Sequence, residues 1–143
     1  MKARTVREGM HLLVLDPGDE LVDCLTRFAT ERNLLGGTFH AIGAASRAVY
    51  AYWDRDRKVY DKFEIPEQME VVSLSGSLAR DEAGEVRIHA HVVFSGRDGS
   101  TIGGHLFEAH AYPTLEVFLT EVAVPLRRQR HPDTGLMLLD MEE

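Results

Sequence analysis

The segment from Val86 to Phe94 constrains the fold more than any other part of the chain, because its side chains alternate in character. One set is wholly apolar and comprises Val86, Ile88, Ala90, Val92 and Phe94. The intervening set comprises Arg87, His89, His91 and Val93. Successive side chains of a β-strand point to opposite faces, so the pattern predicts a strand with one face in the core. The two histidines then project together from the other face.

Further strands are predicted where alternation recurs between turn-forming residues. These segments are residues 38–42, 48–53, 58–63, 70–74 and 116–124. Residues 54–57, 81–84 and 95–99 separate several of them and contain aspartate, glycine or both. Connections this short join neighbouring antiparallel strands, so we expect a mainly antiparallel sheet.

One helix is expected before the first of these segments. Asp16 can accept hydrogen bonds from the free N–H groups of a helix start, and Pro17 suits the first turn. The helix should end near Asn33, ahead of a Gly-Gly pair. Its apolar stripe includes Leu21, Leu25 and Phe28. The predicted fold class is α+β, with one or two helices covering the sheet in one domain over residues 1–143.

Charge and cysteine content narrow the function classes. The chain has 143 residues, with 16 basic and 23 acidic side chains and a formal net charge of −7. This balance opposes nucleic acid as a default partner, because affinity for a phosphate backbone comes from neutralising its charge. The basic run at residues 127–130 is short and is expected to be a solvated surface face. Cys24, in the predicted helix, is expected to be a small core residue.

We expect a cytoplasmic protein without a membrane anchor. No run of about 18 apolar residues is present to span a bilayer, and residues 1–10 lack the apolar stretch of a signal peptide. The single cysteine cannot form an intrachain disulfide, which agrees with a reducing compartment.

His89, His91 and His105 have the spacing of a metal site. Residues two apart on a strand stand about 7 Å apart at their backbones, so two imidazoles can converge on one ion. His105 follows a turn that can return the chain beside the first strand, and the preceding Gly103-Gly104 pair permits a close approach. Three neutral imidazoles leave a fourth position open for water or a small ligand, as in reactive zinc sites. Ligand preference favours zinc, with iron, nickel and copper still open.

A simpler explanation remains open from spacing alone. The His-x-His pattern occurs by chance in strands, and two histidines on a solvent face need no metal. If a metal is present, Glu108 and Glu70 are candidate general bases, and His110 is a candidate partner for the ligands. The remaining histidines are expected on an early strand, for His40, or at the surface, for His11 and His131.

Several motifs occur in a defined order along the chain. They are Asp16–Leu21 at the helix start, Phe39–Ala44, Tyr60 at the end of a hairpin, Glu70–Gly76, His89–His91, Asp98-Gly99, Gly103–Leu106, Thr114–Phe118 and Thr134–Leu139. In this order they resemble the plants and prokaryotes conserved (PPC) domain. The resemblance extends from about residue 5 to about residue 139, and the Gly-Gly-His-Leu motif with the upstream His-x-His is its most specific part.

The resemblance has implications for fold, assembly and site. Members of this family form an antiparallel sheet with flanking helices and assemble as homotrimers. Prokaryotic members are described as metal-containing proteins with a suggested role in DNA binding. Carried over by position, the zinc ligands are His89, His91 and His105.

Two departures from plant members bear on partners. The plant protein-interaction segment Gly-Arg-Phe-Glu-Ile-Leu corresponds to Glu67–Val72, which keeps Glu70 and lacks Gly-Arg-Phe. The Gly-Arg-Pro core of the AT-hook, which reads the DNA minor groove, is absent from the chain. A plant-like protein partner is therefore not expected, and the net charge and the missing AT-hook disfavour DNA.

Two classes of function are consistent with these patterns. The first is a stand-alone regulatory or DNA-binding module whose zinc site holds the fold or senses a ligand. The second is a metal-dependent hydrolase or isomerase that acts on a small molecule at the open zinc position. A cupin-type oxygenase is not expected, because Val92–Gly96 lacks the glutamate that follows the His-x-His motif in cupins.

Overall fold

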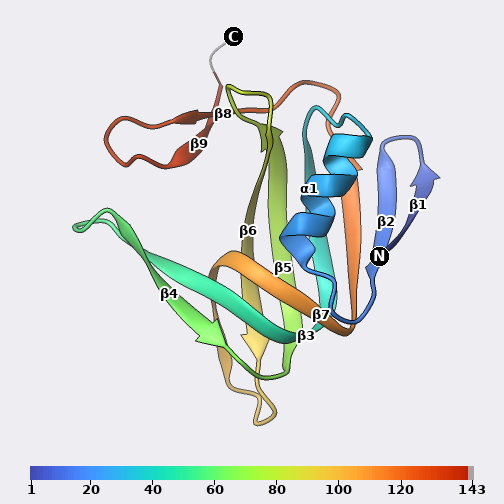
Figure 1. The fold of residues 1–143 in the computed structure, drawn as a ribbon, viewed down its shortest axis with the longest axis vertical. Helices are drawn as coiled ribbons and strands as arrows, with labels where there is room; N and C mark the ends of the chain where they lie inside the picture. Colours follow the sequence, from blue (N-terminus) through green and yellow to red (C-terminus); the bar gives the residue numbers. More distant parts are fainter. Residues whose placement is uncertain (142–143) are drawn as a thin grey trace.

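The computed structural model describes residues 1–141 as a bent, mainly antiparallel sheet with one helix packed against it (Figure 1). In chain order the elements are β1 (Lys2–Arg7), β2 (Met10–Leu15), α1 (Leu21–Glu31), β3 (Gly37–Asp54), β4 (Val59–Ile65), β5 (Met69–Arg80), β6 (Val86–Ser95), β7 (Thr101–Glu121), β8 (Arg127–Arg130) and β9 (Met137–Asp140). The predicted mainly antiparallel sheet with a flanking helix is confirmed. Among the described residues, no helix has the length and apolar character needed to cross a bilayer.

The central strands form a closed circuit. The strand order is β1-β2-β7-β3-β5-β8-β9, and β4 pairs with β3 outside this path. β6 pairs with both β5 and β7, and β3 also pairs with both, so these four strands connect back to one another. The ladders are antiparallel except for a single parallel pair between β5 and β8. The circuit places β6 and the first part of β7 side by side, which positions the candidate site.

β3 and β7 are longer than the sequence patterns indicate. The segments predicted at residues 38–42 and 48–53 belong to one strand of 18 residues. Of the segment predicted at 116–124, residues 116–121 form the end of a strand of 21 residues and residues 122–124 lie beyond it. The ladder between these strands shifts register at three points, between residues 43 and 50 of β3. Such irregularities bend a strand and disturb its alternation without ending its pairing. The sequence pattern therefore breaks where the strand only bends.

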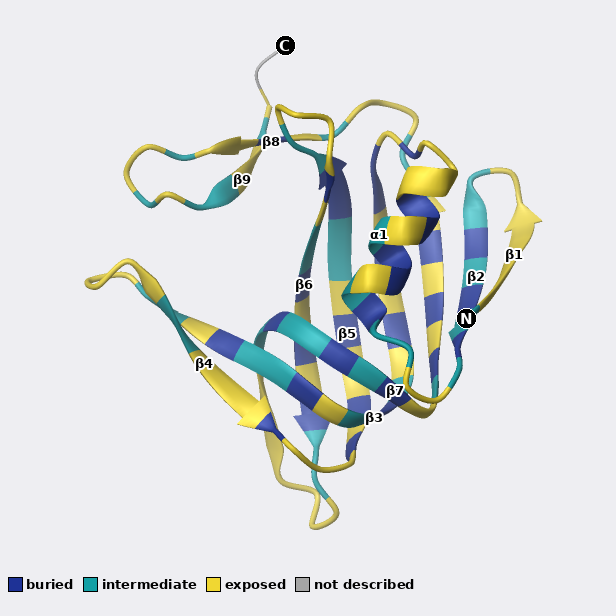
Figure 2. Ribbon diagram, in the orientation of Figure 1, coloured by how far each residue is buried: buried dark blue, intermediate teal, exposed yellow. Residues whose placement is uncertain are grey.

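Helix α1 packs its apolar stripe against the inner face of the sheet, as Figure 2 shows by the buried residues along the helix. The predicted cap is wrong. Glu20 accepts hydrogen bonds from the backbone N–H groups of Val22 and Asp23, at 3.0 and 2.7 Å, whereas Asp16 pairs with the chain's amino terminus and with Lys2. The largest fully buried side chains are Phe94, Leu13, Leu15, Leu21, Leu25, Leu74, Leu78, Leu115, Leu119 and Val117.

The terminal hairpins, β1–β2 and β8–β9, were not predicted, and His11 on β2 corrects the surface assignment. Only 4% of His11 is exposed, because β2 pairs with β7 and the imidazole packs edge-on against Phe28. The imidazole lies 2.5 Å from the carboxylate of Glu121 and 3.1 Å from the hydroxyl of Thr5. All residues of β1 are exposed, so this strand carries no buried alternation that a sequence pattern can reveal.

Candidate metal centre

Three histidines meet where β6 pairs with the first part of β7. His89 and His91 alternate with buried core residues of β6, so both side chains point away from the core. His91 lies directly opposite His105 in the antiparallel ladder. One potential ligand atom from each histidine lies within 4.8 Å of the others. The predicted convergence of the three side chains is therefore present.

The spacing of the three rings suits a single metal ion. The ring centroids lie 5.2 Å apart for His89 and His91, 5.1 Å for His89 and His105, and 5.5 Å for His91 and His105. In a tetrahedral zinc site with Zn–N bonds of about 2.1 Å, ligand nitrogens stand about 3.4 Å apart. Small side-chain rotations therefore suffice to bring the three nitrogens to bonding distance.

The Gly103-Gly104 pair explains how β7 approaches its neighbours so closely at the site. A Cβ atom on Gly103 would lie 2.1 Å from the carbonyl oxygen of Val92, and one on Gly104 would lie 2.5 Å from that of Ala51. Both distances are far below any real contact, and both obstacles are backbone atoms. Larger residues here would push β7 away from β6 and β3, and His105 with it.

Aromatic rings enclose His105. Tyr60 from β4 stacks on its imidazole at 4.7 Å, and Phe107 contacts it edge-on at 5.0 Å. This burial, with smaller contributions from His89, His91 and Arg128, lowers the pKa of His105 to about 4. Burial is also the main cause that lowers the pKa of His89. Both rings are therefore held neutral at pH 7, which is the form that binds metals.

One ring nitrogen of His105 has no partner. Its Nδ1 is buried and makes no hydrogen bond to any part of the chain that the structure describes. A buried polar atom without a partner costs about 1–3 kcal/mol, and native structures rarely leave one without a reason. A bound metal would supply such a reason. It would either be coordinated by this nitrogen directly, or bind the other ring nitrogen and hold the ring so that Nδ1 can bond to a further ligand.

A cavity of about 320 Å³ adjoins two of the histidines. Its walls come from separate parts of the chain, since β4 lies on one side and the β8–β9 hairpin on the other (Figure 1). The lining residues are Tyr60, Arg87, Ile88, His89, His105, Phe107, Arg128, Leu136, Met137 and Leu138. Most of this wall is apolar, and the polar groups are basic or aromatic. A small molecule in this space would lie beside His89 and His105.

Arg128 is buried in this wall, which corrects the prediction of a solvated basic run. Only 3% of Arg128 is exposed, whereas Arg127 and Arg130 on the same strand are exposed. Its guanidinium donates hydrogen bonds to the carbonyl oxygen of Met137 at 3.0 Å and to the hydroxyl of Ser77 at 2.9 Å. The pairing of β8 with β9 and its contact with β5 turn this one side chain inward.

The three other candidate residues lie elsewhere. Glu108 binds His110 at 2.6 Å and Arg47 at 3.4 Å, and it lines a separate hollow formed by residues of β3, β4 and β7. His110 also forms a backbone bridge with Glu20 at the start of α1. Glu70 pairs in register with Ser95, at the opposite end of β6 from His89. The structure thus brings together the three histidines and leaves these residues outside the cluster.

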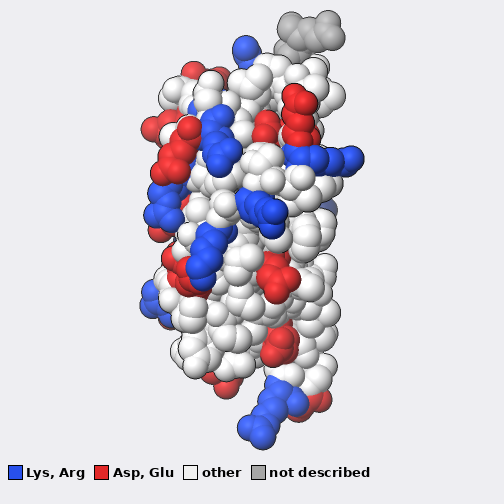
Figure 3. Space-filling model, turned by 90° about the vertical axis from the view of Figure 1, so that its right-hand side faces the viewer, with Lys and Arg blue, Asp and Glu red and all other residues white. Residues whose placement is uncertain are grey.

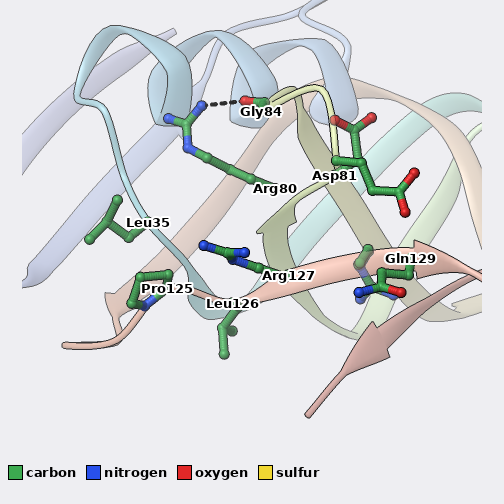
Figure 4. Close-up of a pocket in the computed structure, with 10 residues that line it drawn as sticks. Leu35, Arg80, Asp81, Gly84, Pro125, Leu126, Arg127 and Gln129 are labelled. Atoms are coloured by element: carbon green, nitrogen blue, oxygen red, sulfur yellow. Dashed lines mark hydrogen bonds between the residues drawn. The ribbon is translucent and has the colours of Figure 1, made fainter. Parts of the chain in front are cut away.

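A second hollow, on the other side of β8, has a different character (Figure 4). It measures about 390 Å³ and lies between the β5–β6 turn and the segment before β8. Two of its charged groups, Arg80 and Asp81, are already paired within the chain. Arg80 donates to the carbonyl oxygens of Leu34 and Gly84, and Asp81 pairs with Arg87. These internal contacts stabilise the turn between β5 and β6.

Sequence reasoning missed Phe107 and Arg128 as parts of the site. Phe107 follows His105 by two residues, so strand alternation alone was a usable signal for its position. Arg128 offered no such signal, because Arg127, Gln129 and Arg130 around it are also polar and hide the inward-facing position. The sequence places Tyr60 at the end of a hairpin and does not indicate that it forms a wall of the histidine site.

Comparison with known proteins identifies the family. The family model of the Plants and Prokaryotes Conserved (PCC) domain matches residues 4–123. The chain belongs to this family. PCC and PPC are two abbreviations of the same domain, so the resemblance predicted from the sequence motifs is confirmed. Among curated proteins, none matches the chain.

Several solved structures share the fold across most of the chain. A metal-containing protein from Archaeoglobus fulgidus is 36% identical, with 91% of each chain covered and a TM-score of 0.84. A PPC protein from Pyrococcus horikoshii is 25% identical, with 94% of this chain and 92% of that chain covered and a TM-score of 0.86. A protein from Bacteroides thetaiotaomicron, described as a putative DNA-binding protein, is 25% identical, with coverages of 99% and 98% and a TM-score of 0.93.

Proposed function

We propose that this PCC-domain protein holds a zinc ion through His89, His91 and His105 and binds a small molecule at the remaining coordination position, as a regulatory module. The observation that carries the proposal is the convergence of three imidazoles beside a cavity, with one buried nitrogen lacking a partner. The metal-containing relative from Archaeoglobus fulgidus supports a metal in this fold. The neutral, all-nitrogen donor set suits zinc, which supplies Lewis acidity at an open position.

Metal analysis of the purified protein tests the site. We expect about one zinc per chain in the native protein and almost none in a His91→Ala variant, because two imidazoles hold the ion far more weakly than three. His40→Ala is the matched control, since His40 is an exposed histidine that stacks on Phe118 of the neighbouring strand and lies outside the cluster. Equal metal content in the His91→Ala variant and the native protein would remove the shared-ligand proposal.

A metal-dependent hydrolase or isomerase is the alternative use of the same site. Such an enzyme requires a proton acceptor beside the metal. Within residues 1–141, no carboxylate lines the cavity next to the histidines, and Glu108 pairs with His110 and Arg47 instead. This arrangement favours ligand binding over hydrolysis. Turnover of a small-molecule substrate that disappears on metal removal while the protein stays folded would favour the enzyme.

DNA binding is a second candidate, because relatives from Bacteroides thetaiotaomicron and Ralstonia eutropha are described as putative DNA-binding proteins. The charge of this chain opposes it. The formal net charge is −7, and on the side that carries β1 and β2 the basic side chains are interspersed with acidic ones (Figure 3). We expect no retardation of duplex DNA in a gel at low salt. Retardation that weakens as salt rises would instead support a phosphate-binding surface.

We also propose that the protein assembles as a homotrimer, as the resemblance to PPC domains implies. Exposed aromatic side chains on the β3–β4 arm support an interface, with Tyr52 69% and Phe63 46% exposed. Aromatic residues are enriched at such interfaces. Light scattering at micromolar concentration should give a mass three times that of the 16.1 kDa chain. A mass of one chain would contradict the proposal.

We propose a cytoplasmic location as well, which the free, buried thiol of Cys24 supports.

A further inference from the structure

Arg128 is a buried cation without a buried anion. Two of its five N–H groups donate to the neutral oxygens of Met137 and Ser77, and within residues 1–141 no carboxylate forms an ion pair with it. Its Nε is buried and has no hydrogen-bond partner in the same part of the chain. Burying an arginine in this way costs free energy that is normally recovered by an opposing charge.

The charge of Arg128 acts on the histidine cavity. Arg128, His89 and His105 line the same cavity. The positive charge of Arg128 contributes to the lowered pKa of both histidines, after burial in each case. A metal dication at the histidines would add further positive charge to the same space. The described lining then holds two arginines and no acidic group, and the metal would be a third cationic group. Arg87 is already paired with Asp81 and Glu85, so Arg128 is the arginine left for a ligand.

The rest of the wall indicates what kind of anion fits. Leu136, Met137, Leu138 and Phe107 make it largely apolar, which suits a carbon skeleton better than an inorganic anion. The cavity volume of about 320 Å³ corresponds to roughly ten non-hydrogen atoms at about 30 Å³ each. The chemical class is therefore a small organic acid.

Resting on the zinc site proposed above, we propose that Arg128 binds the carboxylate of a small organic acid whose other polar group occupies the open metal position. After the contacts with Met137 and Ser77, Nη1 and Nη2 of Arg128 each keep one N–H group, whereas Nε is buried. A carboxylate can accept these two N–H groups side by side, which is the strongest hydrogen-bonding arrangement available to an arginine. The ligand would thus be recognised at one end by charge, at the other by the metal, and between them by apolar contact.

A matched pair of thiol ligands tests this assignment on the full chain loaded with cobalt(II) in place of zinc. The acid 3-mercaptopropionate and the isosteric neutral amide 3-mercaptopropionamide both place a thiolate on the metal, which changes the visible spectrum of cobalt. Titrations in about 0.2 M salt limit long-range charge effects, since the screening length is then below about 8 Å. We expect the native protein to bind the acid about tenfold more tightly than the amide.

Variants of β8 assign the preference to one side chain. Arg128→Gln should reduce the acid-to-amide ratio to about one, mainly by weakening binding of the acid, whereas Arg128→Lys should keep part of the preference. Arg127→Gln is the matched control, because Arg127 is exposed on the same strand and its loss removes the same charge. A preference that survives in Arg128→Gln would overturn the assignment.

The outcomes also separate this inference from the zinc site on which it rests. If cobalt binds and the native protein takes acid and amide equally, the role of Arg128 is wrong and the metal site stands. If the native protein takes up no cobalt, both proposals fall. The first comparison needs no variant, so it decides the matter even if Arg128→Gln fails to fold.

Discussion

His11 and His105 both lie against aromatic rings, and they differ in their hydrogen-bond partners. Each lies on a strand and contacts a phenylalanine ring edge-on, at 5.2 Å for Phe28 and 5.0 Å for Phe107. His11 has partners on both ring nitrogens, the carboxylate of Glu121 and the hydroxyl of Thr5. The Nδ1 of His105 is buried with no such partner among the described residues.

The contrast separates a structural histidine from a functional one. A ring with both nitrogens satisfied contributes to folding and has nothing left to offer a ligand. A ring with an unsatisfied nitrogen is a cost to the folded chain that binding can recover. Four measurements test whether the two histidines differ in this way.

Zinc should stabilise the native protein strongly through the His105 site. At free zinc about a thousandfold above the dissociation constant, binding to the folded state alone adds about 4 kcal/mol to the free energy of unfolding. Urea denaturation with zinc and with a chelator measures this difference. The gain should vanish in His105→Ala and persist in His11→Leu. A zinc-dependent gain of equal size in His105→Ala would end the distinction between the two histidines.

Replacement of His11 by leucine should destabilise the protein by about 2 kcal/mol, because the carboxylate of Glu121 and the hydroxyl of Thr5 lose their shared partner. Glu121 is 34% exposed, so water limits the loss. Urea denaturation without metal measures this loss of stability. The zinc content of the purified variant should stay at the native level. A loss of zinc in this variant would show that His11 supports the site after all.

The sequence predicted the parts of the fold where burial leaves a repeating pattern. β6 and α1 each bury one face, and both were located to within a few residues. The hairpins β1–β2 and β8–β9 were missed, because β1 is exposed throughout and β8 consists of four polar residues. Local patterns also divided β3, whose bend depends on its pairing with β7.

The candidate site was predictable where its residues share a short local pattern. His89 and His91 are two apart, and His105 follows one turn later, so strand geometry sufficed to bring them together. Tyr60 and Arg128 reach the same cavity from β4 and β8, and their arrival depends on how distant strands pack. Glu108 shows the converse, that closeness in sequence does not ensure closeness in space. It is three residues from His105 and pairs with His110 and Arg47.

The metal-free protein should lose stability in mild acid because of the histidine cluster. The pKa of His105 is about 4 in the folded protein and about 6.5 in an unfolded chain. Between these values the unfolded chain binds more protons, so stability falls as pH falls from about 6.5 towards 4 and is insensitive to this group above 6.5. Since water reaches part of the ring, we expect the free energy of unfolding to fall by about 1–2 kcal/mol over this pH window. Urea denaturation at several pH values, in the presence of a chelator that removes metal, measures how the free energy of unfolding changes with pH. A His105→Leu variant should show a smaller slope, and an unchanged slope would assign the acid sensitivity to other groups.

The smallest effect is expected for His105→Leu at neutral pH without metal. Leucine removes the buried nitrogen that lacks a partner, which favours the variant by about 1–3 kcal/mol, and loses the stacking on Tyr60, which costs about 1 kcal/mol. The imperfect fit of a branched chain between two rings offsets much of the remaining gain. We therefore expect stability within about 1 kcal/mol of the native protein, on either side. Because His11→Leu makes the same chemical change at a satisfied ring and should cost about 2 kcal/mol, the difference between the two variants measures what hydrogen-bond partners contribute to a buried imidazole. Equal losses of stability in the two variants would mean that His105 stabilises the fold as His11 does, and would contradict a ligand-binding role for its Nδ1 atom.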